Sequence, residues 1–362
     1  MNIAFVSSGN SIHVKKLANG LIENGHDVTL YTLPNHTNLI SDFDSKVKIV
    51  KLRFKGKLGY YLNAFQLRRY IVRGDYNIVN CHYVSGYGTL VRLARIKGVV
   101  ASVFGSDVYT FPYKSNRNMK IVIKNLDHAE IITSTSYVMA DKVKEFYKKD
   151  RNIKVTHFGV DLNLFNLSSS NKKVDSGVFT FGAVKKMIDT YGIDVLINAF
   201  SLFIKSEKYL DKKIQLVLYG SGVHLNKYKK MAKKLNLENE IIFKGYIPNS
   251  EVPNALESID VVCLPSINES FGVAAVEAMA CAKPLIVSDA PGFLEVIEPS
   301  ITGFVVKKGD PNDLAQMMEK LYNMNPDERS KLGIQGRKRV ETLFNFNDNI
   351  KKYLEAITKN SY

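Results

Sequence analysis

Two carboxylates, Glu269 and Glu277, lie eight positions apart and bracket a stretch in which a loop is expected to pass into a helix. Between them, Phe271, Gly272 and Val273 lie where a helix is expected to begin, and the unpaired N–H groups of a helix start favour an anion. One carboxylate can accept hydrogen bonds from sugar hydroxyls and the other from ribose hydroxyls, while the amides hold a diphosphate. A nucleotide sugar would satisfy all three groups. Spacing alone, however, favours a simpler interpretation, in which Glu269 caps the helix and Glu277 is solvated.

The surrounding stretch predicts a strand, a loop, a helix and a second strand, in that order. Val261–Leu264 is a short apolar run typical of a buried parallel strand, and Pro265–Gly272 is a loop punctuated by Pro, Ser, Asn and Gly. Val273–Cys281 is rich in Ala, Val, Met and Glu, which favours a helix, and Lys283-Pro284 ends it. Leu285–Ser288 resumes as the next strand. The loop would then lie at the carboxyl end of a parallel strand, where open α/β sheets bind ligands.

The same stretch resembles a known signature. Glu269-Ser-Phe-Gly, then Glu277-Ala-Met-Ala and Lys283-Pro-Leu-Ile, is similar to the E-x7-E motif of the retaining glycosyltransferases of family 4. The resemblance covers essentially the whole chain. It implies the GT-B fold class, an α/β architecture in which two Rossmann-like, doubly wound parallel-sheet domains face each other across a cleft. A C-terminal helix crosses back to the first domain in that fold.

The resemblance also predicts where the domains divide. Residues 1–166, together with a C-terminal helix at about 345–362, would form the acceptor-binding domain, and residues 167–344 the nucleotide-sugar-binding domain. Residues 167–176 are rich in Ser, Asn and Lys, which is typical of a linker. A chain of 362 residues is long enough for two domains with separate cores.

The resemblance assigns the donor site to the second domain. Glu277 would hold the ribose, and Glu269 would contact the sugar near the reacting carbon. Backbone amides would bind the diphosphate, glycines would let the donor approach the backbone closely, and apolar residues would pack on the base. The donor-binding residues implied besides Glu277 are Phe271, Gly272, Val273, Gly182, Gly220, Ile247 and Val252.

The positive charge for the departing diphosphate has to come from a lysine in this chain. Most family members carry an Arg directly after the glycine that corresponds to Gly182, and a Lys some residues later, and both grip the diphosphate. Ala183 occupies the Arg position, which leaves Lys185 or Lys186 for this catalytic role. The chain is a few residues longer than the family pattern before Tyr191-Gly192, which leaves open which lysine acts, and a solvated loop is the alternative interpretation.

In the first half of the chain, Gly9, His13 and His82 are predicted to face the acceptor. His13 stands in a stretch similar to the family's first strand–helix unit, although by itself a helix-start His without a role would explain it better. Many members carry His-Gly-x-Asp further on, with the His beside the reacting sugar. This chain has Phe104 in place of that His and keeps Asp107, which is predicted to be catalytic. A retaining front-face reaction is compatible with this change, because the leaving phosphate can accept the acceptor's proton.

Charge is concentrated in the first half. Residues 1–165 carry 24 basic against 12 acidic residues, a net +12, whereas residues 166–362 carry 26 against 23, a net +3. A strongly basic half of a chain indicates an anionic binding partner. Because no recognised nucleic-acid motif accompanies the charge, we expect this partner to be an anionic membrane surface and not nucleic acid. Nine basic residues lie between Lys46 and Arg73, among apolar residues at roughly helical spacing. A membrane-binding helix and an ordinary helix with its apolar stripe in the core explain this pattern equally well.

Composition predicts a cytoplasmic protein, and the basic first half predicts peripheral attachment to the inner face of the membrane. Cys81, Cys263 and Cys281 show no metal or disulfide spacing and are expected to be buried thiols. No signal peptide is expected, because Met1–Val6 leads straight into a strand without a basic or long apolar region, and no apolar run approaches the ~20 residues of a membrane span. Neither a metal nor a cofactor is expected beyond the nucleoside diphosphate sugar as co-substrate.

These patterns predict a retaining, metal-independent hexosyltransferase that moves a sugar from a nucleoside diphosphate sugar to an acceptor hydroxyl. A lipid-linked or glycan acceptor in cell-surface polysaccharide synthesis is expected. Two alternatives remain: a catalytically weak partner subunit that binds nucleotide sugar, and an epimerase or phosphorylase of the same fold. Phe104 and Ala183 support the weak subunit, whereas the intact Glu269 and Glu277 argue against it.

Overall fold

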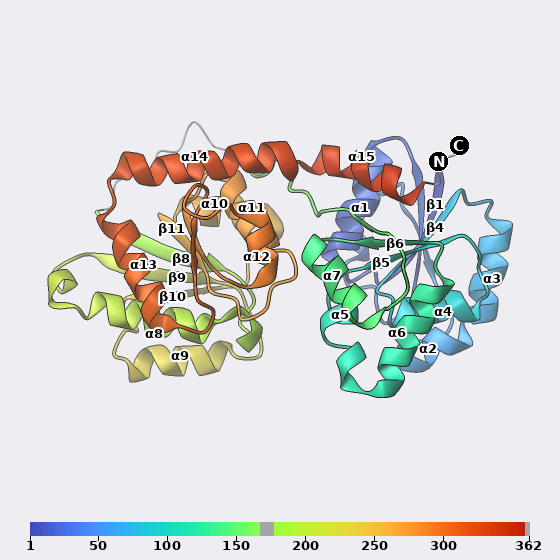
Figure 1. Ribbon diagram of the computed structural model, residues 1–362, viewed down its shortest axis with the longest axis horizontal. Helices are drawn as coiled ribbons and strands as arrows, with labels where there is room; N and C mark the ends of the chain where they lie inside the picture. Colours follow the sequence, from blue (N-terminus) through green and yellow to red (C-terminus); the bar gives the residue numbers. More distant parts are fainter. Residues whose placement is uncertain (167–176, 359–362) are drawn as a thin grey trace. The chain divides into compact units, whose positions relative to one another are not determined.

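The computed structural model describes residues 1–166 and 177–358, which form two compact units. Unit 1 comprises Met1–Gly159 and the chain from Asn347 onward, and unit 2 comprises Val160–Phe346. The predicted linker, residues 167–176, and the last residues of the predicted C-terminal helix lie outside the described residues. Each unit is an α/β layer structure with helices on both faces of one parallel sheet (Figure 1).

Unit 1 is built on a parallel sheet with the strand order β3-β2-β1-β4-β5-β6-β7. Its strands are short apolar runs, as expected when helices cover both faces of a sheet. In chain order they are β1 (Asn2–Val6), β2 (Asp27–Thr32), β3 (Lys48–Lys51), β4 (Ile78–His82), β5 (Val99–Val103), β6 (Ile131–Ser134) and β7 (Ile153–Val155).

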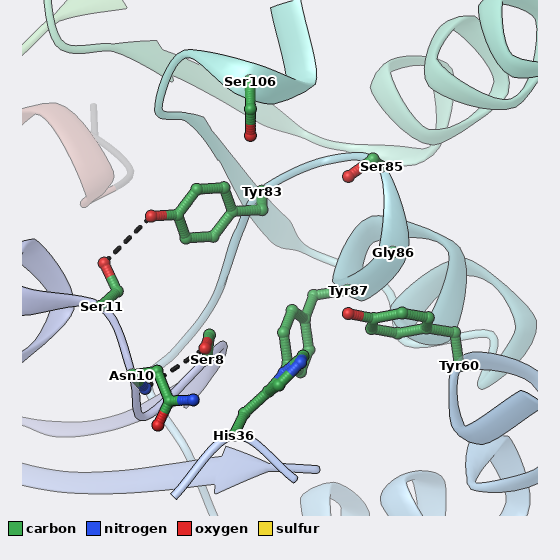
Figure 2. Close-up of a pocket in the computed structure, with 10 residues that line it drawn as sticks. All are labelled: Ser8, Asn10, Ser11, His36, Tyr60, Tyr83, Ser85, Gly86, Tyr87 and Ser106. Atoms are coloured by element: carbon green, nitrogen blue, oxygen red, sulfur yellow. Dashed lines mark hydrogen bonds between the residues drawn. The ribbon is translucent and has the colours of Figure 1, made fainter. Parts of the chain in front are cut away.

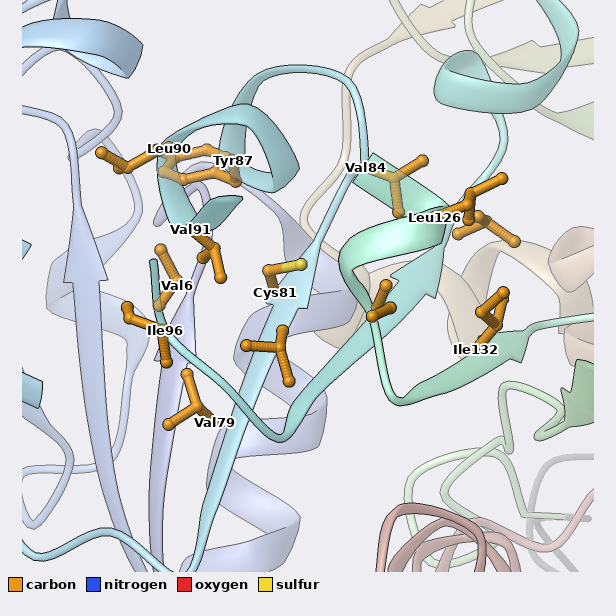
Figure 3. Packing of buried hydrophobic residues seen from close by; sticks show 14 of the residues in the cluster. Val6, Val79, Cys81, Val84, Tyr87, Leu90, Val91, Ile96, Leu126 and Ile132 are labelled. Atoms are coloured by element: carbon orange, nitrogen blue, oxygen red, sulfur yellow. The ribbon is translucent and has the colours of Figure 1, made fainter. Parts of the chain in front are cut away.

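The helices of unit 1 pack around this sheet. They are α1 (Ile12–Glu23), α2 (Gly56–Leu62), α3 (Ala64–Arg73), α4 (Gly86–Leu93), α5 (Ser106–Tyr109), α6 (Asn116–His128), α7 (Tyr137–Phe146) and α15 (Phe346–Ile357), with 3-10 turns at Ile40–Asp42 and Pro112–Lys114. Val6, Val79 and Cys81 from the sheet pack with Leu90 and Val91 of α4 in one core cluster (Figure 3).

The C-terminal helix α15 belongs to unit 1 although it follows unit 2 in the chain. Its Ile350, Tyr353 and Ile357 are buried, and the Tyr353 hydroxyl bonds the side-chain amide of Asn80 in β4. The predicted return of the last helix to the first domain is therefore confirmed. No helix in residues 1–166 or 177–358 is long and apolar enough to cross a membrane.

Unit 2 has the strand order β10-β9-β8-β11-β12-β13, again fully parallel. Its strands are β8 (Phe179–Val184), β9 (Ile214–Tyr219), β10 (Ile241–Gly245), β11 (Val261–Leu264), β12 (Leu285–Ser288) and β13 (Phe304–Val306). Its helices are α8 (Ile193–Ile204), α9 (Leu225–Lys234), α10 (Val252–Glu257), α11 (Val273–Ala280), α12 (Pro291–Val296), α13 (Pro311–Asn323) and α14 (Pro326–Leu343), with 3-10 turns at Asp189–Tyr191, Glu207–Tyr209 and Asn249–Glu251.

Both sheets reverse their direction of growth at one point. In unit 1 the chain builds β1, β2 and β3 outward and then returns to place β4 beside β1. In unit 2 it builds β8, β9 and β10 and then returns to place β11 beside β8. Loops at the carboxyl ends of the central strands diverge at such a switch point, which leaves a ligand-binding crevice in open α/β sheets. The candidate residues should therefore be sought in the loops after β1 and β4, and after β8 and β11.

The stretch around the two carboxylates folds as predicted. Strands β11 and β12 have the expected bounds, and the helix between them, α11, ends at Ala280, one residue before the predicted end. The predicted α/β class with two Rossmann-like parallel-sheet units is likewise confirmed.

Candidate functional site

At the switch point of unit 2, Lys185 meets Glu269. Lys185 directly follows β8, and Glu269 lies in the loop after β11. The Lys185 ammonium donates a hydrogen bond to Oε2 of Glu269 at 2.7 Å, across 84 positions of sequence. The two side chains are only 12% and 10% exposed, so this is a nearly buried ion pair.

Lys185 is held in its charged form. Burial by itself lowers the pKa of an ammonium, but the negative charge of Glu269 outweighs it and, with Tyr191 and Glu277, raises the pKa of Lys185 above its ordinary value. The ammonium also lies 4.3 Å from the centroid of the Tyr191 ring, within the range of a cation–π contact. Unit 2 therefore presents a nearly buried, permanent cation next to a carboxylate.

The structure separates the two candidate lysines. The backbone N–H groups of Lys185 and Met187 donate to the carbonyls of Tyr219 and Ser221, which prolongs the β8–β9 ladder. Side chains alternate along an extended strand, so Lys185 and Met187 point inward and Lys186 points into solvent. Only Lys185 reaches Glu269.

Gly220 keeps this arrangement in place. It follows β9 with a φ of 135°, a conformation that side chains disfavour, and a Cβ there would lie 1.9 Å from the carbonyl oxygen of Lys185. The loop after β9 can approach the lysine backbone so closely only because position 220 is glycine.

Glu277 lies in the second turn of α11 and is buried. Its Oε1 accepts a hydrogen bond from the side-chain amide of Asn249 at 3.3 Å. Asn249 belongs to the segment that also carries the half-buried Ile247 and the buried Val252. The structure thus brings Glu277 together with the segment predicted to pack on a nucleotide base, and it excludes the interpretation of Glu277 as a solvated side chain.

The start of α11 is shaped by Gly272, the residue that precedes the helix, with φ at 97°. A glycine has no side chain with which to cap the first N–H groups. A Cβ at Gly272 would lie 2.8 Å from the ring of Phe293, and Phe271 is buried against Phe344. Packing therefore fixes the loop that leads into Val273, the first residue of the helix.

Gly182 has a different setting from the other predicted donor residues. It is buried inside β8, three positions before Lys185, and a Cβ there would lie 2.5 Å from Cδ1 of Ile259. Its lack of a side chain serves close packing of Ile259 on the sheet. The structure does not bring it to the carboxyl edge with Lys185.

Together, the residues at this edge combine one cation, two carboxylates and a helix start. A cation can neutralise a phosphate, and carboxylates accept hydrogen bonds from hydroxyls, so the edge can hold a compound that carries both groups. Within the described part of the chain, no cluster of His, Cys, Asp or Glu could hold a metal ion.

In unit 1, His82 and Asp107 are both buried. The His82 ring packs on Phe5 and Phe104, its nitrogens have no hydrogen-bond partner among the described residues, and burial lowers the pKa of His82 to about 3. Asp107 accepts hydrogen bonds from the backbone N–H groups of Val84, Phe104 and Gly105 at 2.9 to 3.1 Å. Burial raises the pKa of Asp107, against the effect of these bonds. Asp107 thus links the loop after β4 to the loop after β5 through hydrogen bonds.

His13 and Phe104 belong to an aromatic cluster. The His13 ring stacks on Phe158 with centroids 4.1 Å apart, and Phe104 meets Phe158 edge-on at 5.2 Å. Phe104 also contacts Tyr83. The phenylalanine at the position of the family's His therefore packs against neighbouring rings.

A pocket of about 260 Å³ opens at the switch point of unit 1 (Figure 2). Loops after β1, β2 and β4, helix α2 and the first residues of α4 and α5 line it with hydroxyls, amides and aromatic rings. None of its lining residues is Lys, Arg, Asp or Glu. The lining residues are Ser8, Asn10, Ser11, His36, Tyr60, Tyr83, Ser85, Gly86, Tyr87 and Ser106. Such a lining suits a neutral, hydroxyl-rich compound.

Hydrogen bonds order the pocket walls. The Tyr87 hydroxyl pairs with Nδ1 of His36 at 2.8 Å, and the Tyr83 hydroxyl pairs with Ser11 at 3.1 Å. Gly9 lies between the lining residues Ser8 and Asn10 in the chain, and its backbone N–H donates to Oγ1 of Thr32. A Cβ at position 9 would lie 2.7 Å from the carbonyl oxygen of His36.

Sequence reasoning missed the lining side chains. Of the predicted acceptor residues, Gly9, His13 and His82, none lines the pocket. The Ser- and Asn-rich loop after β1 and the turn around Tyr83 were the available signals. His36 and Tyr60 carry no local signal, because only folding brings them to the pocket.

Comparison with known proteins gives two family matches. A model described as glycosyl transferases group 1 matches residues 167–339, and one described as glycosyl transferase 4-like matches residues 2–136. An uncharacterized glycosyltransferase of Methanocaldococcus jannaschii is 24% identical, over 88% of this chain and 86% of that protein. The capsular polysaccharide biosynthesis glycosyltransferase CapM of Staphylococcus aureus is 25% identical, over 84% and 78%.

Solved structures share the fold of the whole chain. Sucrose-phosphate synthase from Thermosynechococcus elongatus matches with a TM-score of 0.82 at 20% identity, and the match covers 98% of each chain. Anabaena HepE in complex with UDP matches with a TM-score of 0.81 at 17% identity, over 99% of each chain. The predicted GT-B class is confirmed by these matches.

Proposed function

The chain belongs to the group 1 glycosyltransferases, and from this we propose that it transfers a sugar from a nucleoside diphosphate sugar to an acceptor hydroxyl with retention of configuration. The observation that carries the proposal is the Lys185–Glu269 pair at the switch point of unit 2, with Glu277 close behind it. In this proposal unit 2 holds the donor and unit 1 the acceptor.

Lys185 has the role of neutralising the departing diphosphate. As the bond between the sugar's reacting carbon and the diphosphate oxygen breaks, negative charge grows on that oxygen. A fixed cation in a partly dehydrated site stabilises such charge without reorganisation. The raised pKa of Lys185 supports this role because the side chain stays protonated. The start of α11 would add N–H groups to the diphosphate, and the proposal requires no divalent metal.

The two carboxylates would contact the ribose and the sugar of the donor, one each. Glu277, buried beside the segment of Ile247 and Asn249, would accept hydrogen bonds from the ribose. Glu269 would lie near the reacting carbon and stabilise its positive character as the bond breaks. The new bond to the acceptor oxygen forms on the face from which the diphosphate leaves, and the acceptor's proton passes to a diphosphate oxygen.

The acceptor hydroxyl would be presented from the pocket of unit 1. Its hydroxyl- and ring-lined walls suit the sugar part of a glycan or of a lipid-linked glycan. A role in polysaccharide synthesis agrees with the likeness to CapM, and the basic first half of the chain agrees with work at an anionic membrane surface. Asp107 and His82 would support the pocket from behind rather than move protons.

A panel of nucleoside diphosphate sugars tests the proposal, with UDP-sugars first because HepE binds UDP. Release of nucleoside diphosphate that depends on an added glycan or alcohol acceptor is expected, and NMR of the product should show the anomeric configuration of the donor. Release without an acceptor, or isomerisation of the donor, would favour a phosphorylase or epimerase. Tight nucleotide-sugar binding without turnover across the panel would favour a partner subunit.

A further inference from the structure

The outer face of α2 and α3 exposes large apolar side chains. Leu58, Leu62, Phe65 and Val72 are 68%, 53%, 80% and 72% exposed. Soluble proteins seldom cluster such residues on their surface without a partner. We call these four residues, with the exposed Tyr61, the outer stripe.

The core accounts for a different set of residues on the same helices. Gly59, Leu67 and Ile71 are buried, and Asn63, which separates α2 from α3, bonds the carbonyls of Phe54 and Gly59. On α3, Phe65 and Val72 lie within about 20° of each other around the helix axis, and Leu67 and Ile71 lie at least about 100° away from them by the 3.6-residue period. The sequence allowed a stripe that faces the core, but the structure places the outer stripe in solvent.

Basic residues dominate the stretch of chain that carries the outer stripe. Residues 45–74 contain nine basic residues and no acidic residue. Lys57, Arg69 and Arg73 are exposed, whereas the Arg68 guanidinium is bound to the carbonyls of Ala94 and Arg95. Exposed apolar side chains among exposed basic ones match a surface that is anionic at its headgroups and apolar beneath them.

We propose that the α2–α3 face docks on an anionic lipid surface, with the outer stripe entering the headgroup region and the basic side chains meeting lipid phosphates. Amphipathic helices of this kind bind membranes without crossing them. A second copy of the chain fits poorly, because a two-fold contact would face two basic patches toward each other. Nucleic acid would leave the aliphatic side chains of the stripe without a partner.

The docking face and the pocket share one helix. Tyr60, between the outer residues Leu58 and Tyr61, points inward and lines the pocket beside Tyr87 (Figure 2). Docking would therefore hold the pocket one helix away from the lipid surface. This link to a lipid-borne acceptor rests on the proposed transfer reaction, whereas the docking itself does not.

Cosedimentation of the full chain with vesicles tests the docking. One set of vesicles is phosphatidylcholine alone, and the other contains phosphatidylglycerol as well. Binding only to the anionic set, weakening as salt rises, is expected because charge attraction is screened over roughly 8 Å at physiological salt. Equal binding to both sets, or binding to neither, would overturn the proposal.

Three double variants assign the binding to the face. Arg69→Ser with Arg73→Ser should weaken binding about 25-fold, since each basic residue near an anionic surface contributes about fivefold. Phe65→Ser with Val72→Ser should weaken it at least about tenfold by removing buried apolar area. Lys229→Ser with Lys233→Ser, exposed in α9 of unit 2, removes equal charge and should leave binding nearly unchanged.

A loss of binding in the α9 variant as large as in the Arg69 and Arg73 variant would show that the overall positive charge of the chain, and not the α2–α3 face, causes the binding. That result would overturn the assignment. A dimer in solution that the Phe65 and Val72 variant abolishes, without vesicle binding, would make the face an interface between copies. Thermal unfolding and diphosphate release with a water-soluble acceptor should be unchanged in all three variants. Because the vesicle assay needs no donor, failure of the transfer reaction would not affect it.

Discussion

Replacing Lys185 by methionine should separate the role of the charge from that of the side chain's bulk. Methionine is close to lysine in length and is apolar, so the site stays filled while the cation is lost. The matched control is Lys186→Met, which removes the same charge from the adjacent, exposed position. Turnover should fall strongly in the first variant and stay near normal in the second.

The expected losses of turnover and of folding stability in Lys185→Met follow from the geometry of the site. Removing one preorganised charge-stabilising group typically lowers kcat by about 10²- to 10³-fold, or ~3–4 kcal/mol. Removing one partner of a buried ion pair costs about 3–5 kcal/mol of stability. Because Lys185 and Glu269 retain 12% and 10% exposure, water can partly solvate the remaining carboxylate, so we expect about 2–4 kcal/mol.

Turnover and urea unfolding should then be measured on Lys185→Met, Glu269→Gln and the double variant. The pair lies at 2.7 Å, so its members should couple: the double variant should lose less stability than the two single losses added, while its turnover stays low. Normal turnover in Lys185→Met, or an equal loss in Lys186→Met, would refute the assignment of the diphosphate charge to Lys185. Strictly additive stability losses would refute the ion pair.

The remaining predictions concern three other positions. Glu277→Gln should raise the donor KM about 10- to 100-fold by weakening a charge-assisted hydrogen bond worth ~1.5–3 kcal/mol, with the exposed Glu251→Gln as control; equal KM values would remove Glu277 from the donor site. Asp107→Ala should destabilise unit 1 by about 3 kcal/mol or more in urea unfolding, because three backbone N–H groups lose their acceptor, and Asp107→Asn by less. Full stability of the Ala variant with lost turnover would instead indicate a chemical role for Asp107. Gly220→Ala should lower both stability and turnover by displacing the Lys185 backbone, whereas Gly245→Ala, with a positive φ of 77° but open space around it, should cost only about 1–2 kcal/mol of stability. Similar losses in the two glycine variants would show that conformation alone, and not the close approach, requires Gly220.

The sequence by itself determined the local units and the chemistry that they carry. β11 and α11 follow from a short apolar run, a loop of Pro, Ser, Asn and Gly, and an Ala-rich stretch, because each signal lies within a few residues of the element it specifies. The similarity of the stretch from Glu269 to Glu277 to the family motif indicated the family for the same reason. The motif lies within one loop and one helix and is therefore contiguous in the chain.

Tertiary structure decided between residues that the sequence could not distinguish. Lys185 and Lys186 are adjacent and identical in type, and only the continuation of the β8–β9 ladder turns one inward to a carboxylate 84 positions away. Along α2 and α3, the apolar period was visible, but which apolar residues would be covered depended on what packs against the helices. His36 and Tyr60 meet in the pocket through strand pairing and helix packing. These outcomes depend on contacts between distant segments, and their energies are absent from any local stretch of sequence.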